Sequence, residues 1–195
     1  PVPNISILSP ATALDLSLCF MYALNAKKPV AIRYPKLSCP SELPGFEENL
    51  SEGRGVFLKN SEFAPNLSLD FEDSKIPHRK ILLACTGGIF DETLILARNL
   101  LQHKIETDIY SLRFIKPFDE EYFYSLAKNY DEVCVIEDGI KTGGIAEYIQ
   151  KYLYEKDFKN VKTFAFPEKF FAQGTRSEIL EDAGISAKKI AKILL

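Results

Sequence analysis

The sequence is poor in the residues that metal sites and catalytic sites most often use. Only two histidines, His78 and His103, occur among 195 residues, and the four cysteines are scattered with no CxxC pair. Structural zinc sites need cysteines and histidines at short, regular spacings. The composition therefore argues against a zinc site and against a catalytic cysteine–histidine pair. Cys85 and Cys134 lie in apolar, strand-like runs, where a thiol packs as a small hydrophobic group.

Long apolar runs and an excess of one charge are also missing. Runs such as Ile81 to Cys85 fall far short of the ~20 apolar residues of a membrane-spanning helix. No charged segment followed by an apolar one opens the chain as a signal peptide would. The formal net charge is only −3, with acidic and basic residues interspersed. We therefore expect a cytoplasmic protein that binds neither nucleic acid nor membranes.

The first forty residues have the pattern of one β-α-β unit. Residues 5–8 predict a strand, Ser9-Pro10 open a helix of period 3.6 that ends near Ala26, and residues 30–34 predict a second strand. Such a unit needs a larger sheet to cover its faces. Because the chain also starts at Pro1 without a methionine, we expect it to be a piece of a longer protein.

Beyond this unit the sequence divides into a linker and a second domain. Residues 41–79 are rich in proline, glycine and acidic residues, with only Gly55 to Lys59 strand-like, so their composition predicts a linker. From residue 80 onward strands alternate with helices, which predicts an α/β domain with a mostly parallel sheet and helices on both faces. The expected strands are residues 80–85, 107–112, 132–137 and 161–166, and the expected helices are residues 91–103, 119–129, 144–154, 176–183 and 186–194.

Two glycine-containing segments follow predicted strands. Thr86-Gly87-Gly88 stands where a phosphate-binding loop would lie, but it lacks the remaining residues of either nucleotide-binding motif, which favours a tight turn that needs small residues. Glu137-Asp138-Gly139, followed by Gly143-Gly144, suggests a metal or acid–base site. Neighbouring residues of a strand point to opposite faces, so the two carboxylates are not expected to meet at one ion. Turn and capping roles are favoured for both.

Two further segments have a structural interpretation. The stretch from Arg113 to Asp119 is interpreted as a strand end, a turn and a helix start with Asp119 as the N-cap. Arg113 and Lys116 are candidates to bind an anion, although neutralising nearby acids is the favoured role. Phe170-Phe171 precede a helix cap, where aromatic residues more often pack in a core or a subunit interface than stack on a cofactor.

Arg33 raises the sharpest functional question. It lies at the carboxyl end of the second predicted strand, which Pro35 closes because its ring removes a ladder donor. In open α/β sheets this end faces the crevice where ligands bind. Arg33 is therefore either a ligand-binding group or half of a structural ion pair, and its position alone leaves both open.

Six segments, taken in order and spacing, point to a known family. They are PNISILSP, AIRYPK, ILLACTGG, RFIKPFD, VIEDGIKTGG and FPEKFFAQG. Together they resemble the carboxyl-terminal third of the 1-deoxy-D-xylulose-5-phosphate synthase family, a branch of the transketolase-like thiamine diphosphate enzymes. The resemblance covers essentially the whole chain and is weakest over residues 41–79. It implies that residues 1–40 are the tail of a pyrimidine-binding domain and residues 80–195 a transketolase carboxyl-terminal domain.

The resemblance implies a transferase that condenses pyruvate with glyceraldehyde 3-phosphate to 1-deoxy-D-xylulose 5-phosphate and CO2, a precursor of isoprenoids, thiamine and pyridoxal. Its cofactor, thiamine diphosphate with Mg2+, would be bound by regions before Pro1, so the chain alone is expected to be inactive and to hold neither cofactor nor metal. Arg33 matches the family arginine that grips the phosphate of the aldehyde acceptor, a role that suits a guanidinium fork. Lys36-Leu37 depart from the arginine–glycine pair usual after Pro35, so no phosphate contact is carried over to Lys36.

The resemblance also implies a homodimer to which the second domain contributes through an apolar cluster. Two alternatives stay open: the β subunit of a 2-oxoacid dehydrogenase, whose final domain has the same layout, and a non-catalytic α/β interaction module. The RYP, RFIKPFD and FFAQG segments favour the synthase. The residues expected in the apolar cluster are Phe164, Phe166, Phe170 and Phe171.

Overall fold

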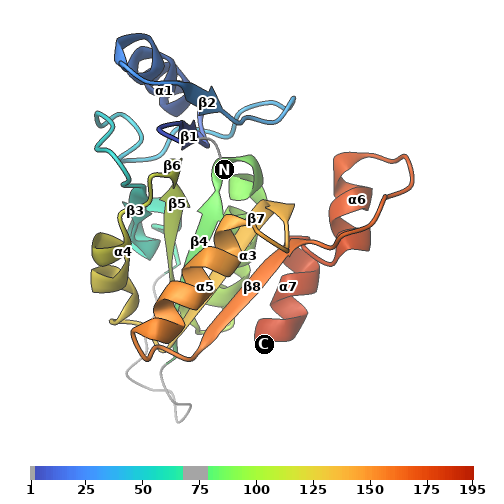
Figure 1. Ribbon diagram of the computed structural model, residues 1–195. Coiled ribbons are helices and arrows are strands. Elements are labelled where there is room, and N and C mark those ends of the chain that lie inside the picture. The colour runs from blue at the N-terminus through green and yellow to red at the C-terminus, as the bar shows by residue number, and fades with distance from the viewer. Residues whose placement is uncertain (1–2, 68–78) are drawn as a thin grey trace.

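A computed structural model describes residues 3–67 and 79–195. The chain forms two sheets, a three-stranded one of order β2-β1-β6 and a five-stranded one of order β3-β5-β4-β7-β8. The small sheet and its helix lie above one end of the large sheet (Figure 1). No helix of the described residues has the length and apolarity needed to cross a membrane.

The small sheet contains the predicted β-α-β unit. Strands β1 (Ser6–Leu8) and β2 (Val30–Ile32) are parallel, and helix α1 (Ala13–Asn25) connects them. The helix begins later than predicted, because its N-cap is Thr12 rather than Ser9. Ser9 is instead used in a tertiary contact, in which its hydroxyl accepts a hydrogen bond from the N–H of Gly87.

The large sheet confirms the predicted α/β class. Its strands β5, β4, β7 and β8 are parallel, and β3 at one edge runs antiparallel to β5. Alternate residues of each strand enter different hydrophobic cores, so that Leu83 faces one core and Leu82 the other. The strands are β3 (Val56–Leu58), β4 (Lys80–Thr86), β5 (Glu106–Leu112), β7 (Glu132–Ile140) and β8 (Val161–Phe166).

Helices cover both faces of this sheet, as predicted. One core contains buried residues of three helices, α3 (Phe90–Gln102), α6 (Arg176–Ala183) and α7 (Ala187–Leu194). The other core contains buried residues of α4 (Glu120–Ala127) and α5 (Ile145–Glu155). Asp119 caps α4 by accepting a hydrogen bond from the N–H of Tyr122, which confirms its predicted role.

The described part of the predicted linker, residues 41–67, is packed against the large sheet rather than spacing two bodies apart. Strand β3 pairs with β5 along the sheet edge, and a short helix, α2 (Asn60–Phe63), follows it. Phe46 and Leu58 are completely buried in the core. The composition suggests a linker because turns dominate it, but a few well-spaced apolar residues are enough to fasten it. Residues 68–78, including His78, lie outside the described residues, and the domain boundaries stay a prediction.

The interpretation of the residues after Arg113 as a turn is wrong for residues 114–116. Residues Phe114–Lys116 form strand β6, which pairs antiparallel with β1 of the small sheet. The chain therefore passes directly from β5 in one sheet to β6 in the other, with Arg113 between them. Three residues are too few to show a periodic pattern, and the partner strand lies more than 100 residues earlier in the chain.

The two aromatic residues before α6, Phe170 and Phe171, lie in different environments. Phe171 makes an edge-to-face contact with Phe166, with ring centroids 5.4 Å apart. Phe170 is fully exposed and does not enter the core of this chain. Of the interpretations offered for the pair, core packing thus fails for Phe170, and a role in a subunit interface stays a prediction.

Candidate functional site at the seam between the sheets

The carboxyl ends of strands from both sheets meet at one seam. Ser9, which follows β1, donates its N–H to the carbonyl of Arg113, which follows β5, at 2.8 Å. The hydroxyl of Ser9 accepts from the N–H of Gly87, which follows β4, at 3.0 Å. The carboxyl ends of parallel strands are where open α/β sheets bind ligands. The seam is therefore the first place to look for a functional site.

The two sheets approach so closely that the turn after β4 has no room for side chains. A Cβ atom on Gly87 would lie 2.0 Å from the carbonyl oxygen of Pro10, and one on Gly88 would lie 2.0 Å from a carboxylate oxygen of Asp138. Residues Gly87–Ile89 form a single 3-10 turn. This confirms the tight-turn interpretation of the glycine pair, because backbone and carboxylate atoms occupy the space that a side chain at either position would need.

Arg33 reaches across the seam. Its backbone N–H extends the β1–β2 ladder by donating to the carbonyl of Leu8 at 2.8 Å, which anchors the residue at the strand end. Its Nη2 lies 3.1 Å from Oδ1 of Asp138 and 3.3 Å from the carbonyl oxygen of the same residue. The Arg33 side chain is still 41% exposed, compared with 17% for Asp138. Arg33 thus forms the ion pair that was one of its two expected roles, while part of its guanidinium faces open space.

Asp138 is itself held in place by the large sheet. Its Oδ1 accepts a hydrogen bond of 2.7 Å from the hydroxyl of Thr86, and the same hydroxyl accepts the backbone N–H of Asp138 at 3.2 Å. Thr86 is completely buried at the end of β4. Asp138 is therefore linked to the neighbouring strand β4 by two hydrogen bonds, one through its carboxylate and one through its backbone N–H.

Glu137, the residue before Asp138, faces a different partner. Strand β7 continues to Ile140, beyond the end predicted at Glu137. The buried carboxylate of Glu137 accepts the N–H of Ala146 in the first turn of α5 at 3.1 Å, which confirms a capping role. Its other oxygen, Oε1, has no hydrogen-bond partner among the described residues. Burial raises the pKa of Glu137 above its ordinary value, against the lowering effect of the helix N–H groups.

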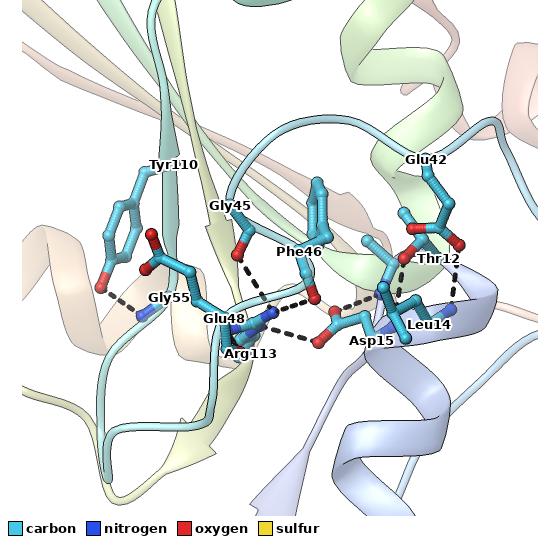
Figure 2. Close-up of polar contacts among 11 residues, drawn as sticks. Thr12, Leu14, Asp15, Glu42, Gly45, Phe46, Glu48, Gly55, Tyr110 and Arg113 are labelled. Atoms are coloured by element: carbon cyan, nitrogen blue, oxygen red, sulfur yellow. Dashed lines mark hydrogen bonds and ion pairs between the residues drawn. The ribbon is translucent and has the colours of Figure 1, made fainter.

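A second arginine crosses the seam in a buried setting. Nε of Arg113 lies 2.7 Å from Oδ1 of Asp15 in α1, and both side chains are almost completely buried. Nη1 and Nη2 donate three further hydrogen bonds to backbone carbonyls of the loop before β3, as Figure 2 shows. This confirms that Arg113 neutralises an acid. The carbonyl acceptors belong to Gly45, Phe46 and Glu48.

A cleft of about 880 Å3 lies at the seam; its lining includes Tyr34 and Gly88, which are neighbours of the Arg33–Asp138 pair, but not the pair itself. Its walls are the glycine turn after β4, residues 34–40 of the segment after β2, and the first turns of α3 and α6. Lys36 and Arg176 bring positive charge to the lining, and Asp91 and Glu92 bring negative charge. Burial raises the pKa of Asp91, with Glu92 adding to this effect. The mixed lining does not select one charge of ligand.

The histidine and cysteines of the described residues and the possible metal ligands are not gathered at the seam. Among the described residues, no group of three or more metal-ligating side chains is placed to hold an ion. His103 lies at the end of α3 with Nδ1 2.9 Å from the carbonyl oxygen of Asn99. Cys85 and Cys134 are buried as predicted, and burial raises the pKa of the Cys85 thiol to about 12.

Sequence reasoning identified Arg33 but missed its partner. Asp138 lies 105 residues after Arg33 in the sequence, and 52 residues after Thr86. The available signal was that both arginine and aspartate end parallel strands, and such ends share one edge of a sheet. The signal does not say which two strand ends come into contact across two different sheets.

Known proteins resemble this chain in sequence along most of its length. The family described as Transketolase, C-terminal domain matches residues 74–190. A 1-deoxy-D-xylulose-5-phosphate synthase of Treponema pallidum (strain Nichols) is 42% identical over 191 residues, which are 97% of this chain and 28% of the relative. A synthase of Caldanaerobacter subterraneus is 28% identical over 195 residues, covering 100% of this chain and 29% of the relative. The chain thus spans less than a third of these relatives.

Solved structures share the fold. A structure titled as a split gene transketolase, an inactive beta4 tetramer, superposes with a TM-score of 0.77 at 21% identity, covering 98% of this chain and 57% of the other. A transketolase of Campylobacter jejuni gives a TM-score of 0.58 at 20% identity, covering 98% of this chain and 26% of the other. These similarities concern the fold alone. Because the family match covers more than half of its residues, the chain belongs to the transketolase C-terminal domain family.

Proposed function

We propose that the chain is the carboxyl-terminal part of a 1-deoxy-D-xylulose-5-phosphate synthase, a transferase that condenses pyruvate with glyceraldehyde 3-phosphate and releases CO2. The observation that carries this proposal is the 42% identity to a Treponema pallidum synthase through 97% of the chain. That identity spans the strands on both sides of the seam. We further propose a cytoplasmic homodimer, to which the large-sheet domain contributes part of the interface.

Within this enzyme Arg33 would bind the phosphate of the aldehyde acceptor. Three features support the role: its place at a strand end, its partial exposure and the donors that have no partner among residues 3–67 and 79–195. Asp138 engages only Nη2, which leaves the N–H groups of Nε and Nη1 for phosphate oxygens. A guanidinium fork matches such oxygens better than an ammonium group does.

Thiamine diphosphate with Mg2+ supplies the electron sink in this class of reaction. The described residues do not fit that group. They contain no cluster of ligands for a metal ion, and the glycine turn after β4 lacks the remaining residues of either nucleotide-binding motif. We therefore propose that other parts of the enzyme bind the cofactor and that the chain alone is inactive.

A chimeric enzyme tests the proposal directly. The chain replaces the matching carboxyl-terminal segment of the Treponema pallidum synthase, and product formation from pyruvate and glyceraldehyde 3-phosphate is measured. We expect the chimera to make 1-deoxy-D-xylulose 5-phosphate. A control chimera carries the matching segment of the Campylobacter jejuni transketolase and is expected to be inactive. A chimera with our chain that folds, dimerises and binds thiamine diphosphate but forms no product would refute the proposal.

Two simpler measurements test the remaining parts. Calorimetric titration of the isolated chain with thiamine diphosphate and Mg2+ is expected to show no micromolar binding, and such binding would contradict the placement of the cofactor site elsewhere. Sedimentation of the active chimera is expected to show a dimer. Removal of residues 80–195 is expected to weaken that dimer, and an unchanged dissociation constant would exclude this domain from the interface.

A further inference from the structure

The Arg33 guanidinium needs an anchor if it is to bind a ligand selectively, because an exposed arginine samples many rotamers. Only its backbone is fixed by the strand ladder, through the N–H that donates to Leu8. The side chain is fastened by one group among the described residues, Asp138, which contacts Nη2 with its carboxylate and its carbonyl oxygen. The direction in which the free part of the fork points therefore depends on Asp138.

The orientation of Asp138 is fixed in turn by Thr86. The hydroxyl of Thr86 donates to the carboxylate oxygen that faces Arg33 and accepts the backbone N–H of the same aspartate. Because Gly88 has no side chain, the second carboxylate oxygen of Asp138 can occupy the space beside it. Thr86, a buried residue of β4, thus orients Arg33, the half-exposed residue that follows β2, through Asp138 of β7.

The geometry points to Asp138 as a positioning residue that, held by Thr86, aims the Arg33 fork at the acceptor phosphate. This inference rests on the proposed function. Asp138 also carries a negative charge close to the site, which by itself would repel a phosphate dianion. Positioning and repulsion act in opposite directions on acceptor affinity, so substitutions that separate shape from charge can tell them apart.

Asp138→Ala in the active chimera removes both the anchor and the charge. We expect KM for glyceraldehyde 3-phosphate to rise about three- to tenfold with little change in kcat, since one charge-assisted hydrogen bond is lost. Asp138→Asn keeps an oxygen for Arg33 but removes the charge, and it is expected to recover most of the loss. The KM for a non-phosphorylated aldehyde is expected to stay unchanged in both variants.

Thr86 provides an independent test if the Asp138 variants fail to fold. Thr86→Val removes the hydroxyl and is expected to raise the same KM about two- to fivefold, whereas Thr86→Ser, which keeps the hydroxyl, is expected to restore it. Asp182→Ala is the matched control, because it breaks a surface pair with Lys169 that is also 3.1 Å long but lies away from the seam. It is expected to leave both kinetic constants unchanged.

The outcomes distinguish this inference from the proposed function. In an Arg33→Ala background, Asp138→Ala is expected not to raise the acceptor KM further, because the anchor then has nothing to hold and only the repulsion is removed. The positioning role is wrong if Arg33→Ala raises the acceptor KM but Asp138→Ala and Thr86→Val do not. It is also wrong if both Asp138 variants lower the acceptor KM. In both cases the proposed function stands. If Arg33→Ala affects both aldehydes equally, the phosphate role and the positioning role fall together.

Discussion

Two arginine–aspartate pairs cross the seam between the sheets, and they differ in what surrounds them. Arg113 and Asp15 lie 2.7 Å apart with 4% and 0% of their side chains exposed, and three backbone carbonyls also accept hydrogen bonds from the guanidinium. Arg33 and Asp138 lie 3.1 Å apart with 41% and 17% exposed. Among the described residues, Arg113 thus donates to four acceptors within the buried seam, whereas Arg33 uses only Nη2 of its guanidinium. The same kind of ion pair is thus buried within the fold at one position and half-exposed at the other.

The largest effect is expected from breaking the buried pair. Asp15→Ala leaves the guanidinium of Arg113 buried without its countercharge, which should lower the free energy of unfolding of the chain by about 3 to 5 kcal/mol. Urea unfolding followed by circular dichroism measures this loss. Asp15→Asn, which keeps acceptor oxygen but not charge, is expected to lose less. A loss below about 1 kcal/mol for Asp15→Ala would show that the seam does not depend on this pair.

Breaking the half-exposed Arg33–Asp138 pair should lower activity rather than stability. Arg33→Ala in the active chimera is expected to lower kcat/KM for glyceraldehyde 3-phosphate ten- to a hundredfold, corresponding to a charge-assisted contact of about 1.5 to 3 kcal/mol. Pyruvate decarboxylation should be spared, and Arg33→Lys should recover only part of the loss because it lacks the fork.

Stability provides the control for this variant. Because Arg33 is 41% exposed, its ion pair should contribute no more than about 1 kcal/mol to the free energy of unfolding. A urea melt of Arg33→Ala that shows a loss of several kcal/mol, together with equal damage to phosphorylated and non-phosphorylated acceptors, would make this pair structural like the other.

A smaller loss should follow from widening the seam between the two pairs. Gly87→Ala places a Cβ atom 2.0 Å from the backbone oxygen of Pro10, which cannot move aside as a side chain can. We expect a loss of about 1 to 3 kcal/mol in the free energy of unfolding from this overpacking. Gly174→Ala is the control, because its Cβ would meet only the flexible end of Glu178 at 3.2 Å. Equal free energies of unfolding for both variants would mean that the seam accommodates a Cβ atom at position 87 without a loss of stability.

The smallest effect concerns Glu137, the buried neighbour of Asp138. Its pKa is raised by burial, so the folded state binds its proton more tightly than the unfolded state. Above the folded pKa the ionised side chain keeps an oxygen without a partner among the described residues, and Glu137→Gln should raise the free energy of unfolding by about 1 kcal/mol. This gain should disappear as the pH falls through the folded pKa. Urea melts between pH 4 and pH 8 test it, and a gain independent of pH would contradict the assignment.

Elements with a clear local signal were predicted well. Strand β8 and helix α6 have the bounds expected from periodicity, and Asp119 caps α4 as its spacing indicated. Elements that depend on a distant partner were not. Strand β6 exists because β1 offers it an edge, and apolar residues of the described part of the predicted linker enter the core because the large sheet accepts β3.

The sequence by itself determined the alternation of strands and helices, the tight glycine turn and the presence of an arginine at a strand end, because periodicity, capping and backbone sterics act over a few residues. Only the tertiary structure decided which arginine became buried and which stayed open. Arg113 and Asp15 are 98 residues apart, and Arg33 and Asp138 are 105 apart. Pairing at that separation depends on which strand ends meet across the two sheets and on how much loop covers each pair, and no local pattern encodes either.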